Sequence, residues 1–126
     1  MIIESTWHPN ARRRTQFSWE ATDDGIRLFH GNGNPIYIIP WTSLKAVLDE
    51  TRRIAAASPR GVVVAGCSQT TPPAGSVGAW VMKAKLKILP SGNLTSQHLS
   101  FIGPILGRMQ HIKPVPGSRS IYWTVV

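Results

Sequence analysis

Hydrophobic residues in the first third of the chain follow a strand-like pattern. Phe17 and Trp19 alternate with polar neighbours, as in a half-buried strand, and two further β-rich runs follow at 26–29 and 35–39. Segments rich in Gly, Asn and Asp separate these runs and are typical of turns. We therefore expect a small antiparallel hairpin or meander over residues 15–40.

The pattern then changes to helical spacing. A first helix is expected to begin at Thr42 or Ser43 and to run to about Ala57, with its apolar residues on one face. The short apolar run 61–65 predicts a single strand, and a second helix is expected over 76–86.

A third helix is expected from Thr95 or Ser96 to about Gln110, and two strands, 112–115 and 120–125, follow it about a Pro-Gly turn. Its apolar face holds Leu99, Ile102, Ile105, Leu106 and Met109. The opposite face holds small and polar residues, namely Ser96, Gln97, Ser100, Gly103, Pro104, Gly107, Arg108 and His111.

This small, polar face has two interpretations. Gly and Pro both disfavour a helix interior, so the segment can be broken or kinked at Gly103 and Pro104. Alternatively, the small residues allow the helix backbone to approach phosphates and base edges closely. Both interpretations remain compatible with a nucleic-acid partner.

Charge is distributed unevenly along the chain. The first 50 residues hold five basic and six acidic residues, a net charge of −1, whereas residues 51–126 hold nine basic residues and no acidic one, a net charge of +9. A long segment of one sign attracts polyanions, which favours nucleic acid as a partner.

Residue types that carry catalysis or bind metals are scarce. No carboxylate follows Glu50, the histidines lack ligand-like spacing, Cys67 is alone, and no glycine-rich segment carries the GK[ST] of a phosphate loop. We therefore expect no enzyme activity, no cofactor and no metal. No run approaches the ~20 apolar residues of a membrane span, and no signal peptide is evident, so we expect a cytoplasmic protein.

Leu106, Met109 and Ile112 are spaced L-x-x-M-x-x-I, and the basic, aromatic segment PVPGSRSIYW follows them. With the order helix, strand, helix, helix, strand, turn, strand, this resembles the winged helix-turn-helix family. The resemblance implies an α+β fold, with a winged helix over residues 41–126. A small β extension of residues 1–40, with a basic arm at 12–14, would precede it.

The resemblance also implies that the third helix enters the major groove and that the hairpin contacts the DNA backbone or minor groove. Gln97, Ser100 and Arg108 are then expected to read bases or to bind phosphates near them. The expected phosphate contacts are Arg52, Arg53, Lys83, Lys85, Lys87 and Lys113, and Arg119 would anchor the hairpin in a narrow groove.

The sequence leaves two hypotheses for function. The first is a small double-stranded-DNA-binding protein that regulates transcription by occupying its site, in which a homodimer would match a pseudo-palindrome. The alternative is a non-catalytic module on the same scaffold that binds RNA or an acidic protein. Competition among duplex DNA, RNA and an acidic polypeptide separates them.

Overall fold

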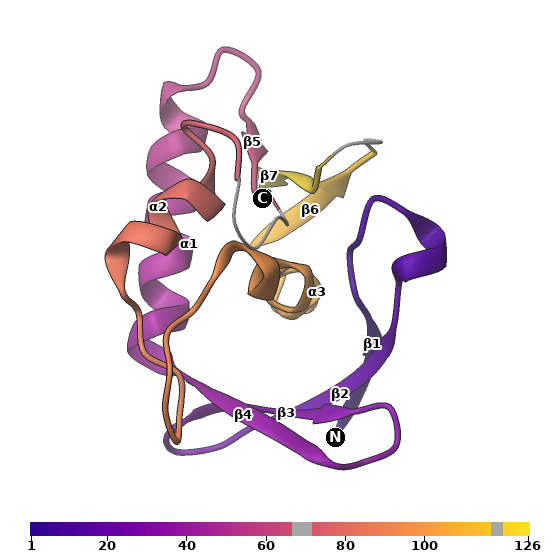
Figure 1. Ribbon diagram of the computed structural model, residues 1–126. Helices are drawn as coiled ribbons and strands as arrows, with labels where there is room; N and C mark the ends of the chain where they lie inside the picture. Colours follow the sequence, from indigo (N-terminus) through magenta and orange to yellow (C-terminus); the bar gives the residue numbers. More distant parts are fainter. Residues whose placement is uncertain (67–71, 117–119) are drawn as a thin grey trace.

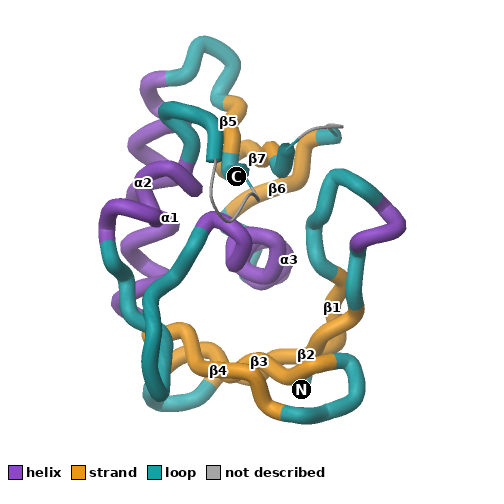
Figure 2. The backbone as a smooth tube through the Cα atoms, viewed as in Figure 1, coloured by secondary structure: helices purple, strands orange, loops and turns teal. Residues whose placement is uncertain are grey.

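The computed structural model describes residues 1–66, 72–116 and 120–126, which form an α+β fold with two antiparallel sheets and three α-helices (Figures 1 and 2). The strands are β1 Ile2–Ser5, β2 Gln16–Ala21, β3 Gly25–His30, β4 Pro35–Pro40, β5 Val62–Val64, β6 Ile112–Val115 and β7 Tyr122–Val125. The helices are α1 Trp41–Ala57, α2 Val77–Ala84 and α3 Leu99–Arg108, with short 3-10 helices η1 Ala11–Arg13 and η2 Ser96–His98. None of the described helices is long and apolar enough to span a membrane.

The first sheet has the strand order β1-β2-β3-β4, with each strand antiparallel to its neighbour. The meander expected over residues 15–40 is confirmed, and β1 is an addition that the sequence pattern did not predict. In the register, Trp19 pairs with Ile2 on one side and Leu28 on the other. Alternation of buried and exposed residues turns one face of this sheet toward the core.

The second sheet has the order β5-β7-β6, so the last strand of the chain lies between the other two. Its register aligns Val62, Thr124 and Lys113 on one face and Val63, Trp123 and Pro114 on the other. Val63 and Trp123 are fully buried, so the second of these faces is the inner one. The three expected strands are confirmed, although β5 is one residue shorter at each end than 61–65 and β7 begins two residues later than 120.

The start of α1 differs from the prediction. The helix begins at Trp41, directly after β4, with Pro40 in the N-cap position and no side-chain cap. Ser43 is buried and its hydroxyl donates instead to the carbonyl of Lys87, at 2.8 Å. Neither Thr42 nor Ser43 caps the helix, because the chain passes from strand to helix without an intervening turn.

Capping residues fix the starts of the other helices. Ser76 caps α2, as expected, and its hydroxyl accepts from the amide of Ala79 at 3.1 Å. This helix ends two residues before the predicted limit, because Lys85 adopts a left-handed conformation with φ of 55°. Thr95 and His98 form a capping box at the start of η2, which leads directly into α3.

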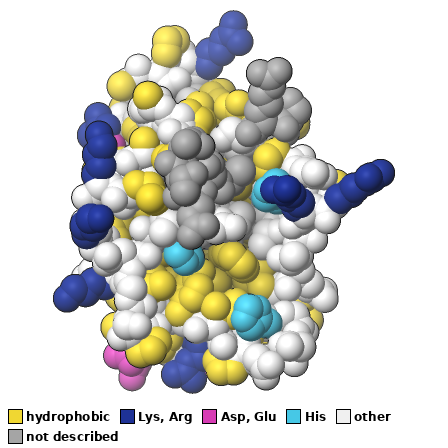
Figure 3. Space-filling view, viewed as in Figure 1, with side chains coloured by type: hydrophobic (Ala, Val, Ile, Leu, Met, Phe, Trp, Pro, Cys, Tyr) yellow, Lys and Arg dark blue, Asp and Glu magenta, His cyan; other side chains and the backbone are white. Residues whose placement is uncertain are grey.

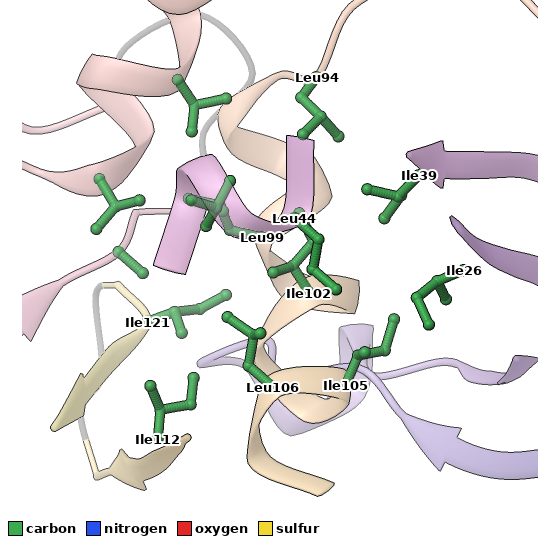
Figure 4. Close-up of a cluster of buried hydrophobic side chains, with 14 of the residues drawn as sticks. Ile26, Ile39, Leu44, Leu94, Leu99, Ile102, Ile105, Leu106, Ile112 and Ile121 are labelled. Atoms are coloured by element: carbon green, nitrogen blue, oxygen red, sulfur yellow. The ribbon is translucent and has the colours of Figure 1, made fainter. Parts of the chain in front are cut away.

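One hydrophobic core joins both parts of the chain. Figure 1 places α3 between the two sheets, with α1 and α2 along one side. In the close-up, Ile26 and Ile39 of the first sheet approach Ile102 and Ile105 of α3 (Figure 4). Ile112 of the second sheet lies on the other side of α3, near Leu106. Residues 1–40 therefore share their core with residues 41–126.

Candidate nucleic-acid interface

The small-residue face of α3 is interior. Gly103 and Pro104 are buried, and the indole of Trp7 lies over the face. A Cβ added at Gly103 would lie 2.6 Å from Cε3 of Trp7, and one at Gly107 would lie 2.9 Å from Cη2 and from Cζ2. The glycines make room for an indole from the N-terminal segment, so the expectation that this face is an outer surface is wrong.

Pro104 has a related role in the same contact. Proline has no amide hydrogen, so the carbonyl of Ser100, one helical turn earlier, lacks its usual partner within the helix. The amide of Trp7 donates to that carbonyl at 3.0 Å. Consequently α3 runs from Leu99 to Arg108 without a break at Gly103 and Pro104.

The three residues expected to read bases do not form one surface. Gln97 is exposed but belongs to η2, before α3 begins. Ser100 is buried and its hydroxyl donates to the carbonyl of Gln97 at 3.0 Å, an arrangement that does not favour its expected contact with phosphate. Arg108 lies at the far end of α3 and its Nε donates to Oε1 of Glu4 at 2.7 Å, which ties α3 to β1.

Residues 12–14 do not extend from the body as an arm. The amide of Arg12 donates to the Asn10 side chain at 3.0 Å, at the start of η1. The guanidinium of Arg14 donates to the carbonyl of His8 at 2.8 Å. These bonds hold the three arginines in and next to a 3-10 helix.

A basic groove lies between the C-terminal half of α1 and the end of β7. It has a volume of about 400 Å³, and its lining residues are Arg52, Ala55, Ala56, Arg60, Gly61, Thr124 and Val125. We call it the Arg52–Arg60 groove. No acidic residue in the described part of the chain lines it.

The turn after α1 places Arg60 in this groove. The amide of Gly61 donates to the carbonyl of Ser58 at 3.2 Å, and the φ of Gly61 is +67°, a left-handed value that glycine adopts without strain. Lys113 is next to the groove, since it pairs with Thr124 and directly opposed residues point to the same face of a sheet. The groove and the strand beside it therefore carry basic residues from three elements, namely a helix, a turn and a strand.

A second groove lies between α1 and α2. Its volume is about 190 Å³, and Glu50 and Arg53 of α1 face Ala79, Trp80 and Lys83 of α2 across it. We call it the Trp80 groove. Because Arg52 and Arg53 are consecutive on a helix, their side chains diverge by about 100°, so each enters a different groove.

The acidic residues on α1 are paired. Lys45 contacts Asp49 at 2.6 Å, and Arg53 donates through Nε and its terminal nitrogen to Oε1 of Glu50. That hydrogen bond, reinforced by the carboxylate charge, raises the pKa of Arg53. Within the described residues, no ion pair involves Arg52, Arg60, Lys83, Lys85, Lys87 or Lys113.

The structure thus brings together part of the predicted phosphate-binding set. Arg52 and Lys113 approach one groove, whereas Arg53 and Lys83 border the other. Lys85 and Lys87 are exposed just after α2. Figure 3 shows dark-blue basic side chains along the left edge of the molecule, where α1 and α2 lie. Arg119 lies outside the described residues.

Sequence reasoning did not select Arg60 as a site residue. Its signal was the turn itself, since Ser58 and Pro59 end the helix and Gly61 allows a sharp return into β5. No cluster of three or more His, Cys, Asp or Glu side chains within residues 1–66, 72–116 and 120–126 could hold a metal ion. No family model, curated protein or solved structure matches this chain.

Proposed function

We propose that this chain is a double-stranded-DNA-binding protein that contacts phosphates through α1, the turn after it, α2 and the small sheet. The observation that carries the proposal is the Arg52–Arg60 groove, which two arginines line and no acidic side chain of the described residues does. Guanidinium groups bind phosphate oxygens through paired N–H donors, and duplex DNA presents such oxygens in a regular row.

The spread of the cations favours a polyanion over a small anion. Arg52, Arg60 and Lys113 come from a helix, a turn and a strand, and Lys83 extends the basic surface to a second helix. A single phosphate could contact only a few of these groups. A polymer contacts many of them and releases a counterion at each contact.

A winged-helix arrangement of residues 41–126 is part of the proposal. The order α1, β5, α2, α3, β6, β7 and the strand order β5-β7-β6 support it. However, Trp7 covers the face of α3 that would have read bases, so we propose backbone binding with little sequence preference. Any regulatory effect on transcription would then come from occupancy of the DNA.

The test is duplex binding across a salt series, measured by fluorescence anisotropy with a labelled random-sequence duplex. Each phosphate contact contributes about 0.9 to the slope of log affinity against log salt. The variant Arg52→Ala/Arg60→Ala should therefore bind more weakly, with a slope shallower by about 1.8. The matched control Arg12→Ala/Arg13→Ala removes the same charge from η1, on the opposite side of the molecule from α1, and should keep the wild-type slope (Figure 1).

Arg108→Ala is a second control, because Arg108 is paired with Glu4 and should leave the slope unchanged. Equal losses in the two double variants would mean that only net charge matters and would contradict the assigned groove. Absence of duplex binding at low salt would reject the proposed function. If RNA or an acidic polypeptide displaces the labelled duplex preferentially, the partner is that class of molecule and not duplex DNA.

A further inference from the structure

The Trp80 groove combines an aromatic ring with cations, which the Arg52–Arg60 groove does not. Trp80 is half-buried, while Arg53 and Lys83 are exposed at the rim. Proteins that bind single-stranded nucleic acid stack bases on aromatic rings and hold the adjoining phosphates with cations. The ring and both cations border one open groove of about 190 Å³.

The groove also contains a hydrogen-bond acceptor with free capacity. Glu50 is only 8% exposed, yet it lines the groove. Within the described residues, both hydrogen bonds that its carboxylate accepts, from two nitrogens of Arg53, go to Oε1. Its Oε2 can therefore accept from a ligand that enters the groove.

A carboxylate selects among bases by their exocyclic groups. Cytosine presents an amine that donates to a carboxylate, and adenine presents one as well. Thymine and uracil present a carbonyl oxygen at the corresponding position, which a carboxylate repels. Glu50 therefore favours an amine-bearing base, and cytosine is the base whose amine carboxylates read most directly.

We propose that the Trp80 groove binds one unpaired base that carries an exocyclic amine, preferably cytosine. The base belongs to a nucleic acid whose phosphates contact the basic surface formed by Arg52, Arg60, Lys83 and Lys113. Trp80 stacks on the base, Lys83 contacts the adjoining phosphate, and Glu50, oriented by Arg53, accepts from the amine. This inference rests on the proposed function and extends it, because it adds a single-stranded segment to the structures that the protein recognises.

The experiment compares oligo(dC), oligo(dT) and a blunt duplex as labelled probes, with the wild-type protein and three variants. We expect the wild type to bind oligo(dC) at least about fivefold more tightly than oligo(dT). Trp80→Leu should weaken binding of oligo(dC) roughly tenfold or more and leave duplex binding unchanged, whereas Trp80→Phe should keep most of the affinity because it keeps an aromatic face.

Glu50→Gln keeps an acceptor for Arg53 and removes the charge, so it should reduce the preference for oligo(dC). Thermal melts confirm that each variant is folded. If Trp80→Leu does not fold, the other two variants still test the proposal. Trp80→Phe should keep most of the affinity for oligo(dC), and Glu50→Gln should lose the preference for oligo(dC) over oligo(dT).

Two results would reject base binding in the Trp80 groove but leave the proposed duplex binding intact. Equal affinity for oligo(dC) and oligo(dT), or parallel losses of duplex and single-strand binding in Trp80→Leu, would reject it even if salt-dependent duplex binding persists. Absence of binding to all three probes would reject the proposed function and the base pocket together.

Discussion

The indole of Trp7 packs against two glycines of α3, and each side of this contact supplies something that the other needs. Gly103 and Gly107 provide the space, Pro104 leaves a carbonyl without a helical donor, and the amide of Trp7 supplies the donor. The ring also lies edge-to-face with Trp123, at 6.4 Å between centroids. A glycine-proline sequence that weakens an isolated helix is thus compensated by a residue almost one hundred positions away.

Gly103→Ala tests this contact at the level of one methyl group. The added Cβ would overlap Trp7, and overpacking of this kind costs about 1–3 kcal/mol. Alanine gains about 1 kcal/mol over glycine as a helix former, which offsets part of that cost. We expect a net loss of up to about 2 kcal/mol in the free energy of unfolding, measured by urea denaturation.

A double-mutant cycle supplies the control. In a Trp7→Leu background the ring atoms of Trp7 are absent and only Cζ3 of Trp123, at 3.2 Å, stays close to the added Cβ, so Gly103→Ala should cost clearly less. If the cost of Gly103→Ala is the same in both backgrounds, the indole is not its cause.

Elements were predictable where local pattern alone determines them. Alternation at Phe17 and Trp19 gave β2, and helical spacing gave α1, whose buried apolar residues Leu44, Val47 and Leu48 recur on one face. The surroundings of α3 were not predictable, since periodicity identifies an apolar face but cannot show that Trp7 covers the opposite one. The short strand β1 was missed because four residues carry too little alternation.

The capping box before α3 gives an element-scale prediction about pH. His98 is half-buried, lies edge-to-face with Tyr37 at 5.1 Å, and its Nδ1 accepts from the amide of Thr95 at 2.8 Å. Burial, which disfavours the charged ring, lowers the pKa of His98. As the pH falls, His98 is therefore protonated in the unfolded chain at a higher pH than in the folded protein.

Stability from this group should be complete above the unfolded value of about 6.5 and should decline as the pH falls through the lower folded pKa. Chemical denaturation across this range should show the free energy of unfolding decreasing as the pH falls. In His98→Gln the decrease should be smaller, whatever the absolute stability of the variant. An identical pH profile for the two proteins would show that His98 is not the titrating group.

At the scale of the whole molecule, sequence and structure contribute different parts of the candidate site. The charge asymmetry identified Arg52, Lys83 and Lys113 as exposed cations, because an excess of one sign must lie largely at the surface. Their division between two grooves, and the place of Arg60, depend on how α1 packs against α2 and β7. Long-range packing of this kind has no local sequence signal.

The shared core predicts that residues 41–126 do not fold alone. In the full chain the buried side chains of α3, among them Ile102 and Ile105, belong to one cluster with Phe17, Ile26 and Ile39. Without residues 1–40 this face of α3 would be open to water, and each large apolar side chain exposed costs about 1.5–3 kcal/mol. Losses at several such positions exceed the 5–15 kcal/mol that typically stabilises a domain.

We therefore expect the 41–126 fragment to lack a cooperative thermal transition, whereas the full chain should unfold in a single transition seen alike by far-UV circular dichroism and tryptophan fluorescence. Adding a separately produced 1–40 peptide should restore part of the transition if the missing core face is the cause. A fragment that melts cooperatively by itself and binds duplex DNA would instead establish residues 41–126 as an independent winged-helix domain. In that case the N-terminal sheet would be an addition to a complete fold, and the burial of α3 by Trp7 would not be needed for stability.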